Sequence, residues 1–141
     1  MITGADVVAA ARGHLNTRWQ HQGRMPGVAL DCLGLVIVVA RQLGCVVADF
    51  DIEGYGRHAD GSMLALCERH MTRIDAFELG CVLALAVVDD PQHLAIVGDY
   101  RHGGRSVIHA HSGEGRVIET RLMFAKNFEL RGIYRLPGVA P

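Results

Sequence analysis

The sequence predicts an α+β fold in which N-terminal helices pack on an antiparallel β-sheet. Apolar residues recur at helical spacing in the first half of the chain, and five short runs rich in β-forming residues follow in the second half. Helices followed by a run of strands are typical of α+β domains. The chain has 141 residues, 50% of them hydrophobic. This is enough for one core, so we expect a single domain over residues 1–141.

The first and third helices are predicted from capping residues and apolar spacing. Thr3 and Asp6 form a capping-box pattern that opens a helix reaching about His14. Ser62 is expected to cap a later helix. The apolar stripe of that helix consists of Met63, Leu64, Cys67 and Met71. The segment 16–29 is polar and rich in glycine, so we expect it to be a loop.

The second helix is the most apolar part of the chain. Asp31 can cap a helix from Cys32 to Leu43, and Gly44 stands where helices often end. Apolar residues occupy nearly every face, so this helix must be buried. Glycine within a helix costs about 0.5–1 kcal/mol relative to alanine. Gly34 therefore indicates the close approach of another backbone or of a substrate.

Five β-rich runs are predicted to be strands. They are residues 81–88, 93–100, 106–112, 116–120 and 131–136. The turn-like sequences DDPQ, RHGG and SGEG separate the first four runs. These strands are expected to pair consecutively as an antiparallel meander, with the buried helix against one face of the sheet.

Composition and charge argue against several classes of function. Lys plus Arg number 14 and Asp plus Glu 15, without a basic stripe that could follow a nucleic-acid backbone. The longest apolar run, 33–40, is too short to cross a membrane. The N-terminus lacks the features of a secretory signal, so synthesis in the cytoplasm is expected. The cysteine spacing fits neither a zinc finger nor a disulfide framework, so we expect no metal and no cofactor.

Cys32 is the candidate nucleophile. It occupies the first turn of the buried helix, where unpaired backbone N–H groups and the helix dipole favour a thiolate. A small core cysteine would produce the same pattern, so the helix alone leaves both interpretations open. The other cysteines lie after a helix end, in a helical stripe and at a strand start, and are not expected to be activated: Cys45, Cys67 and Cys81.

A nucleophilic cysteine needs a base and a group that orients the base. His93 begins one apolar strand and His109 lies within the next, so antiparallel pairing would bring the two imidazoles together. His111 shares the face of His109, so spacing does not choose between them. Taken singly, a strand-edge histidine or a core histidine explains each position more readily than catalysis. The other histidines are expected to be solvated in loops or at helix ends: His14, His21, His58, His70 and His102.

Three motifs resemble those of the NlpC/P60 cysteine peptidases and occur in the same order. They are DCLGLV at 31–36, QHLAIV at 92–97 and VIHA at 107–110. The segment NTRWQHQGR at 16–24 is similar to the loop that precedes the nucleophile in that family. The combination of HQGR with DCxGL particularly resembles stand-alone members from bacteriophage tail gene clusters and gene-transfer agents. The resemblance extends over nearly the whole chain.

The resemblance implies a minimal papain-like fold and hydrolysis of peptide bonds in bacterial peptidoglycan, typically the D-γ-glutamyl to diaminopimelate linkage. By motif position, it implies that Cys32 is the nucleophile, His93 the general base and acid, and His109 the orienting residue. The stem peptide would meet the residues around them: Trp19, Asp31, Gly34 and His111. It also implies location in a virion tail, with tail proteins as partners and the cell wall as the place of action.

Some positions depart from the family pattern. Leu33 follows the cysteine where many members have serine, and Trp19 stands where a tyrosine is common. The first strand opens with Gly80 and Cys81, where the second residue is usually an aspartate.

Two alternatives of other classes remain open. The same residues could serve a papain-like amidase or acyl transferase with another substrate, or the chain could be a structural tail-assembly protein with an idle cysteine. The presence of Cys32, His93 and His109 together favours an enzyme.

Overall fold

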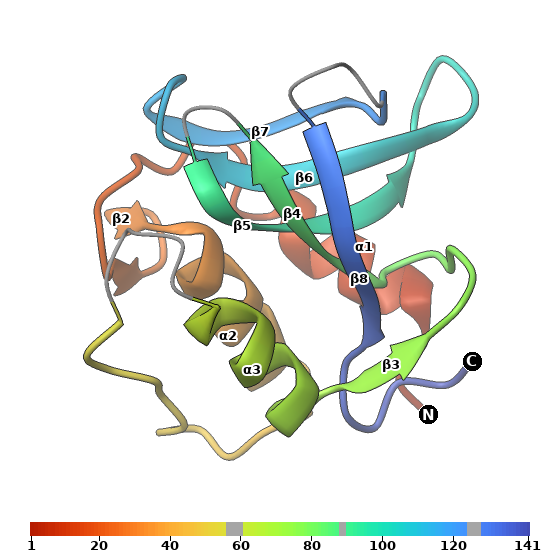
Figure 1. The fold of residues 1–141 in the computed structure, drawn as a ribbon, viewed down its shortest axis with the longest axis horizontal. Coiled ribbons are helices and arrows are strands. Elements are labelled where there is room, and N and C mark those ends of the chain that lie inside the picture. The colour runs from red at the N-terminus through yellow and green to blue at the C-terminus, as the bar shows by residue number, and fades with distance from the viewer. Residues whose placement is uncertain (56–60, 88–89, 124–127) are drawn as a thin grey trace.

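The computed structural model describes residues 1–55, 61–87, 90–123 and 128–141. Within them, helices lie against one side of a six-stranded antiparallel sheet (Figure 1). The helices are α1 (Gly4–Arg12), α2 (Cys32–Gln42) and α3 (Ser62–His70). The sheet contains β3 (Thr72–Ile74), β4 (Val82–Val87), β5 (Asp90–Asp99), β6 (Arg105–His111), β7 (Arg116–Arg121) and β8 (Phe128–Arg135). The predicted α+β class is confirmed.

The strand order is β3-β8-β4-β5-β6-β7. The first four predicted strands, β4 to β7, pair consecutively as expected. The fifth, β8, returns to the other side of β4, and the short strand β3, which the sequence did not predict, pairs with β8. The sheet is therefore a four-stranded meander, β4 to β7, with β8 and β3 added beside β4. In the chain, β3 precedes the meander and β8 follows it.

The structure differs from the predicted elements in two segments, where residues typical of loops and turns pair as strands. The segment predicted as a loop contains a small hairpin, formed by β1 (Arg24–Met25) and β2 (Ala29–Leu30). Residues 90–92 of the predicted DDPQ turn belong to β5. Residue 88 of the first predicted strand, residue 89 of that turn, and His58 lie outside the described residues.

The predicted caps of the first two helices are confirmed. In α1, the Thr3 hydroxyl accepts from the Asp6 backbone N–H at 3.2 Å and the Asp6 carboxylate accepts from the Thr3 N–H at 2.8 Å. In α2, the Asp31 carboxylate accepts from the Gly34 N–H at 2.7 Å. Residues 32–40 of α2 are all buried, as its composition predicted.

The predicted cap of α3 is wrong. Gly61, with φ of 83°, is the N-cap residue, and Ser62 is the first residue of the helix. The side chain of Gln92 takes the capping role, because its Oε1 accepts from the Met63 N–H at 3.1 Å. A cap supplied by a distant strand leaves no signal in the local sequence.

The expectation that all five remaining histidines are solvated is wrong for His14. This residue is buried, and its Nε2 is 2.7 Å from Oε1 of Gln42. The contact joins the end of α1 to the end of α2. His21 is half-buried and packs edge-on against Tyr55, whereas His70 and His102 are exposed as expected.

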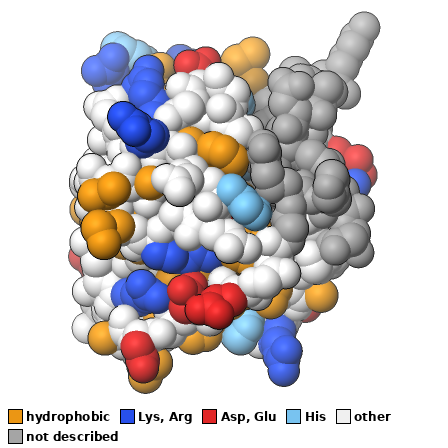
Figure 2. All heavy atoms as spheres, turned by 90° about the vertical axis from the view of Figure 1, so that its left-hand side faces the viewer, with side chains coloured by type: hydrophobic (Ala, Val, Ile, Leu, Met, Phe, Trp, Pro, Cys, Tyr) orange, Lys and Arg blue, Asp and Glu red, His pale blue; other side chains and the backbone are white. Residues whose placement is uncertain are grey.

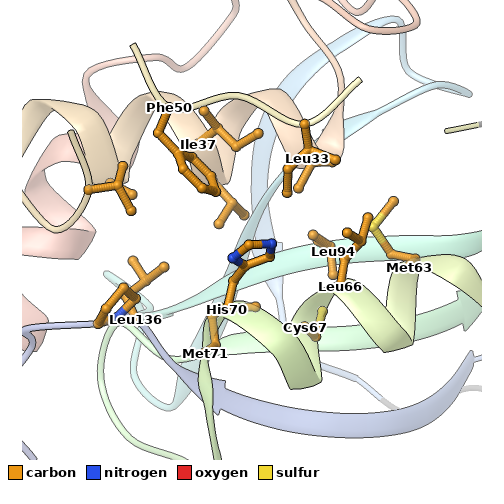
Figure 3. Close-up of a pocket in the computed structure, with 15 residues that line it drawn as sticks. Leu33, Ile37, Phe50, Met63, Leu66, Cys67, His70, Met71, Leu94 and Leu136 are labelled. Carbon is orange, nitrogen blue, oxygen red and sulfur yellow. The ribbon is translucent and has the colours of Figure 1, made fainter. Parts of the chain in front are cut away.

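Apolar side chains from α1, α2 and α3 pack on one face of the sheet and form the main core. A smaller cluster lies on the opposite face and consists of Cys81, Leu83, Leu85, Ala95, Val97 and Val107. An apolar pocket of about 40 Å³ remains in the main core between α2, α3 and the segment that follows α2. In Figure 3, Phe50 and Ile37 approach this pocket from one side and His70 from the other. Among the described residues, no helix is long and apolar enough to cross a membrane.

Candidate active site

Cys32 is the first residue of α2, and only 7% of it is exposed. Its thiol points to the backbone carbonyl oxygen of Gln92, 3.9 Å away. Gln92 immediately precedes His93 on β5, so the start of the buried helix lies against the strand that carries this histidine. The N–H groups of a first helical turn have no partner within the helix, and they favour negative charge at this position.

His93 and His109 form a buried pair, one of the two pairs that antiparallel pairing of their strands allowed. Nε2 of His93 is 2.6 Å from Nδ1 of His109, and the ring planes are inclined by 70°. Only 2% of His93 and 5% of His109 are exposed. A hydrogen bond of this kind fixes the orientation and tautomer of both rings.

His111 completes a group of three imidazoles. Its ring centroid lies 5.3 Å from that of His109 and 6.2 Å from that of His93. Its Nδ1 accepts a hydrogen bond from the Glu114 backbone N–H at 3.0 Å, so the proton of the neutral ring is on Nε2. His109 makes the 2.6 Å contact with His93, and the ring of His111 packs edge-on against both of these histidines.

The surroundings of His109 keep its ring neutral. Burial, together with the nearby His93 and His111, lowers the pKa of His109 to about 3. A neutral His109 can accept a hydrogen bond from the Nε2–H of His93 at its own Nδ1. Its Nε2 is buried and has no hydrogen-bond partner among the described residues.

The surroundings of the other three thiols keep them protonated. Burial raises the pKa of Cys67 to about 12 and also raises the pKa of Cys45 and of Cys81. All four cysteines are free thiols. The chain therefore places one thiol at a helix start and the others in surroundings that oppose ionisation.

Limited treatment with iodoacetamide near neutral pH is expected to modify Cys32 before any other cysteine. The thiolate is the reactive form, and the first turn of α2 favours it at Cys32, whereas Cys45, Cys67 and Cys81 are held as thiols. Peptide mass mapping of the folded protein measures the order of modification. Cys45 is the sharpest internal comparison because it is more exposed than Cys32. Earlier labelling of Cys45 would contradict the assignment of Cys32.

The structure brings Asp31 and Gly34 to the same helix start. A Cβ added to Gly34 would lie 2.1 Å from the backbone oxygen of Gly23. The close approach that this glycine indicated is therefore made by the backbone of the preceding loop. Trp19 is half-buried; its backbone forms a bridge with Leu30 and donates a hydrogen bond to the carbonyl of Gly115 at 2.8 Å.

Arg24 and Tyr55 also reach this helix start, although no pattern in the sequence indicates it. Arg24 Nη1 lies 3.0 Å from Oδ1 of Asp31, and the Tyr55 hydroxyl lies 2.5 Å from Oδ2. The motif HQGR contains Arg24, but its sequence does not reveal the partner of the guanidinium. Tyr55 lies in a segment with no recognisable motif.

Basic and acidic side chains lie close together on the face that carries β2 and the start of α2 (Figure 2). Within the described residues, no group of three or more His, Cys, Asp or Glu side chains is arranged to hold a metal ion.

Solved structures of NlpC/p60 domains share this fold. The NlpC/p60 domain of the peptidoglycan hydrolase SagA aligns with 95% of this chain and 99% of its own, with a TM-score of 0.60 and 22% identity. NlpC1 from Trichomonas vaginalis aligns with 94% of this chain but 44% of its own, with a TM-score of 0.67 and 16% identity. An N-acetylmuramoyl-L-alanine amidase from Bacteroides uniformis aligns with 95% and 98%, with a TM-score of 0.63 and 10% identity.

No family model and no curated protein matches the sequence. The likeness therefore concerns the three-dimensional structure, and it extends over nearly the whole chain. The chain has the papain-like α+β fold of NlpC/p60 domains.

Proposed function

We propose that this chain is a cysteine peptidase that hydrolyses peptide bonds in the stem peptides of bacterial peptidoglycan. Cys32, His93 and His109 are its catalytic triad. The observation that carries the proposal is the 2.6 Å contact between His93 and His109, with the Cys32 thiol 3.9 Å from the carbonyl oxygen of Gln92, the residue before His93. The fold shared with the NlpC/p60 domain of the peptidoglycan hydrolase SagA supports the substrate class.

In the first step, the Cys32 thiol gives its proton to His93 and the thiolate attacks the carbonyl carbon of the scissile peptide bond. A carbon–sulfur bond forms, and the carbonyl oxygen becomes an oxyanion. The backbone N–H of Cys32, at the start of α2, helps to stabilise this oxyanion. The neutral His109 accepts a hydrogen bond from the Nε2–H of the charged His93 at its Nδ1, and this keeps the His93 ring in place.

In the second step, His93 donates its proton to the leaving nitrogen, and the carbon–nitrogen bond breaks. The products are a free amine and a thioester between the substrate acyl group and Cys32. His93 then removes a proton from a water molecule that attacks the thioester, and this releases the carboxylic acid and restores the thiol. Each proton taken up by His93 is thus returned within one turnover.

We propose the D-γ-glutamyl to diaminopimelate bond as the linkage that is cleaved, on the basis of the three motifs around Cys32, His93 and His109. The fold shared with an N-acetylmuramoyl-L-alanine amidase favours a second candidate, the amide bond between muramic acid and L-alanine. Both reactions are acyl transfers from an amide, and the same residues would carry them out.

Purified protein incubated with soluble muropeptides is expected to release peptides that begin with diaminopimelate, and to leave L-alanyl-D-glutamate on the muramic acid. Mass spectrometry of the fragments identifies the bond, because amidase activity would instead yield muramic acid without any peptide. The Cys32→Ala variant is the matched control and should release nothing. Cleavage of unrelated acyl substrates without any muropeptide, and without loss in Cys32→Ala, would exclude the cell-wall function.

We also propose that the protein acts from a bacteriophage tail. The similarity of HQGR and DCxGL to tail-associated proteins supports this location. The formal net charge of −1 gives the protein little attraction to anionic wall polymers. Delivery to the cell wall by a phage particle would supply the localisation that this charge does not. Immunogold labelling of purified particles should place it at the tail tip, and added protein should lyse whole cells weakly. Strong lysis by the protein alone, without labelling of any particle, would contradict this location.

A further inference from the structure

The carboxylate of Asp31 stands one residue before Cys32 and is fully occupied by the protein. Oδ1 accepts from the Gly34 N–H at 2.7 Å and from Arg24 Nη1 at 3.0 Å. Oδ2 accepts from the Gln22 N–H at 2.8 Å and from the Tyr55 hydroxyl at 2.5 Å. Its side chain is 5% exposed. Each oxygen thus has two donors, which is more than an N-cap needs to hold a helix end.

Arg24 joins three segments at this point. Besides Asp31, its guanidinium donates to the Tyr55 hydroxyl at 2.6 Å and to the Ile52 carbonyl at 3.2 Å. Its Nε donates to Asp51 at 2.8 Å. The hairpin that carries Arg24 and the segment 51–55 are therefore both fastened to the start of α2.

Tyr55 acts in this cluster as a neutral donor. Burial and the adjacent Asp31 raise the pKa of its phenol, so the proton stays on the hydroxyl and is shared with the carboxylate. Its ring lies under the guanidinium, with Arg24 Cζ 5.3 Å from the ring centroid. This packing holds Arg24 on the side of Asp31.

The charge of Asp31 has a consequence for the neighbouring thiol. A carboxylate at a helix start stabilises the helix, but it opposes a second negative charge in the same turn. Two like charges a few residues apart at a helix start repel each other more strongly where burial keeps water away from them. Without a compensating cation, Asp31 would cancel much of the benefit that the helix end gives to a Cys32 thiolate.

We infer that Arg24 and Tyr55 are positioning residues for the nucleophile. They hold Asp31 as the cap of α2, and Arg24 offsets its charge, so that the electropositive helix end acts on Cys32. This inference rests on the proposed role of Cys32. Other charged or titratable groups near this cluster, within the described residues, include Asp51, which pairs with the outer edge of Arg24, His21, which packs edge-on against Tyr55, and His93 on β5.

The backbone packing around Gly34 supports the inference independently. A Cβ at this position would lie 2.1 Å from the Gly23 oxygen, 3.0 Å from Arg24 Nη1 and 3.1 Å from Asp31 Oδ1. The first turn of α2 thus accommodates the loop and the guanidinium only because residue 34 is glycine. The ion pair is built into the packing of the nucleophile helix.

The test is the rate of Cys32 alkylation by iodoacetamide as a function of pH in the full chain. Arg24→Gln is expected to move the midpoint of this profile to higher pH and to lower the rate at pH 7 by about threefold or more, which corresponds to roughly half a pKa unit. Tyr55→Phe should act in the same direction with a smaller effect. Adding Asp31→Asn to Arg24→Gln should restore the profile, because asparagine still caps a helix but carries no charge.

Arg41→Gln is the matched control. Arg41 also donates to the segment after α2, at the Phe50 carbonyl, and lies 3.9 Å from Asp51, but it is at the far end of the helix. Its replacement should leave the profile of Cys32 unchanged. If Arg24→Gln does not fold, Asp31→Asn alone is informative, and its midpoint should move to lower pH.

An unchanged profile in folded Arg24→Gln, or no shift in Asp31→Asn, would overturn the inference. So would failure of the double variant to restore the profile, because a purely structural role of Arg24 predicts no rescue. A proposed function that is itself wrong gives a different result, in which Cys32 of the unaltered chain is not the first thiol to be alkylated. The two failures are therefore distinguishable.

Discussion

Replacement of His93 by alanine is expected to reduce the turnover of muropeptides by about 10²–10⁴-fold, the usual contribution of a general acid and base. His109→Asn should retain more activity, because an amide oxygen can still accept from Nε2 of His93 when the imidazole is lost. His111→Ala should be the mildest change, since the ring of His111 only packs edge-on against His93 and His109, whereas His109 makes the 2.6 Å contact with His93. Measurement of kcat/KM for the three purified variants tests this order.

The comparison of His109 with His111 makes this series decisive. Both histidines lie on β6, two residues apart, and both rings contact His93. If His111→Ala were as inactive as His93→Ala while His109→Ala remained active, the orienting residue would be His111 and the triad as proposed would be wrong. Thermal unfolding of each variant separates loss of chemistry from loss of folding.

Acidification is expected to destabilise the protein through His109. Its pKa is about 3 in the fold and 6.5 as its ordinary value, so below pH 6.5 the unfolded chain binds a proton that the native state does not. This contribution to stability is complete above about pH 6.5 and is lost progressively as the pH falls towards 3. The loss approaches about 1.4 kcal/mol per pH unit, or roughly 2 kcal/mol at pH 5. Urea unfolding between pH 7 and pH 4 measures it.

His109→Asn should show a flatter dependence of stability on pH over this range, because asparagine does not titrate. His102→Asn is the matched control, since His102 is exposed and its replacement should leave the slope unchanged. Equal slopes for the unaltered chain and for His109→Asn would show that the buried imidazole is not the source of the acid sensitivity.

Local sequence predicted those elements whose signals lie within a few residues. The reciprocal cap of Thr3 and Asp6, the Asp31 cap and the apolar α2 all correspond to the structure. The cap of α3 and strand β3 could not be predicted in this way, because Gln92 and β8 supply their partners from far along the chain. The same holds for His14, whose burial depends on Gln42 at the end of another helix.

The candidate site divides along the same line. The sequence placed Cys32 at a helix start and His93 and His109 on adjacent antiparallel strands, and the structure brings these elements together. The pairing of β5 with β6 joins Ile96 to Ile108, and the same register continued along both strands would place His111 opposite His93. Strand alternation therefore could not predict which of the two histidines contacts His93. The 2.6 Å contact to His109 depends on the side-chain geometry of the folded protein.

The sequence by itself determined the α+β class, the buried helix that begins at Cys32 and the set of residues from which a triad could be built. Periodicity and capping act between neighbours along the chain, so they can be seen without a structure. Only the tertiary structure decided that Arg24 and Tyr55 converge on Asp31, and that Gly34 admits the backbone of Gly23. These contacts join segments of different elements, and their energies depend on burial and distance, which exist only once the chain has folded.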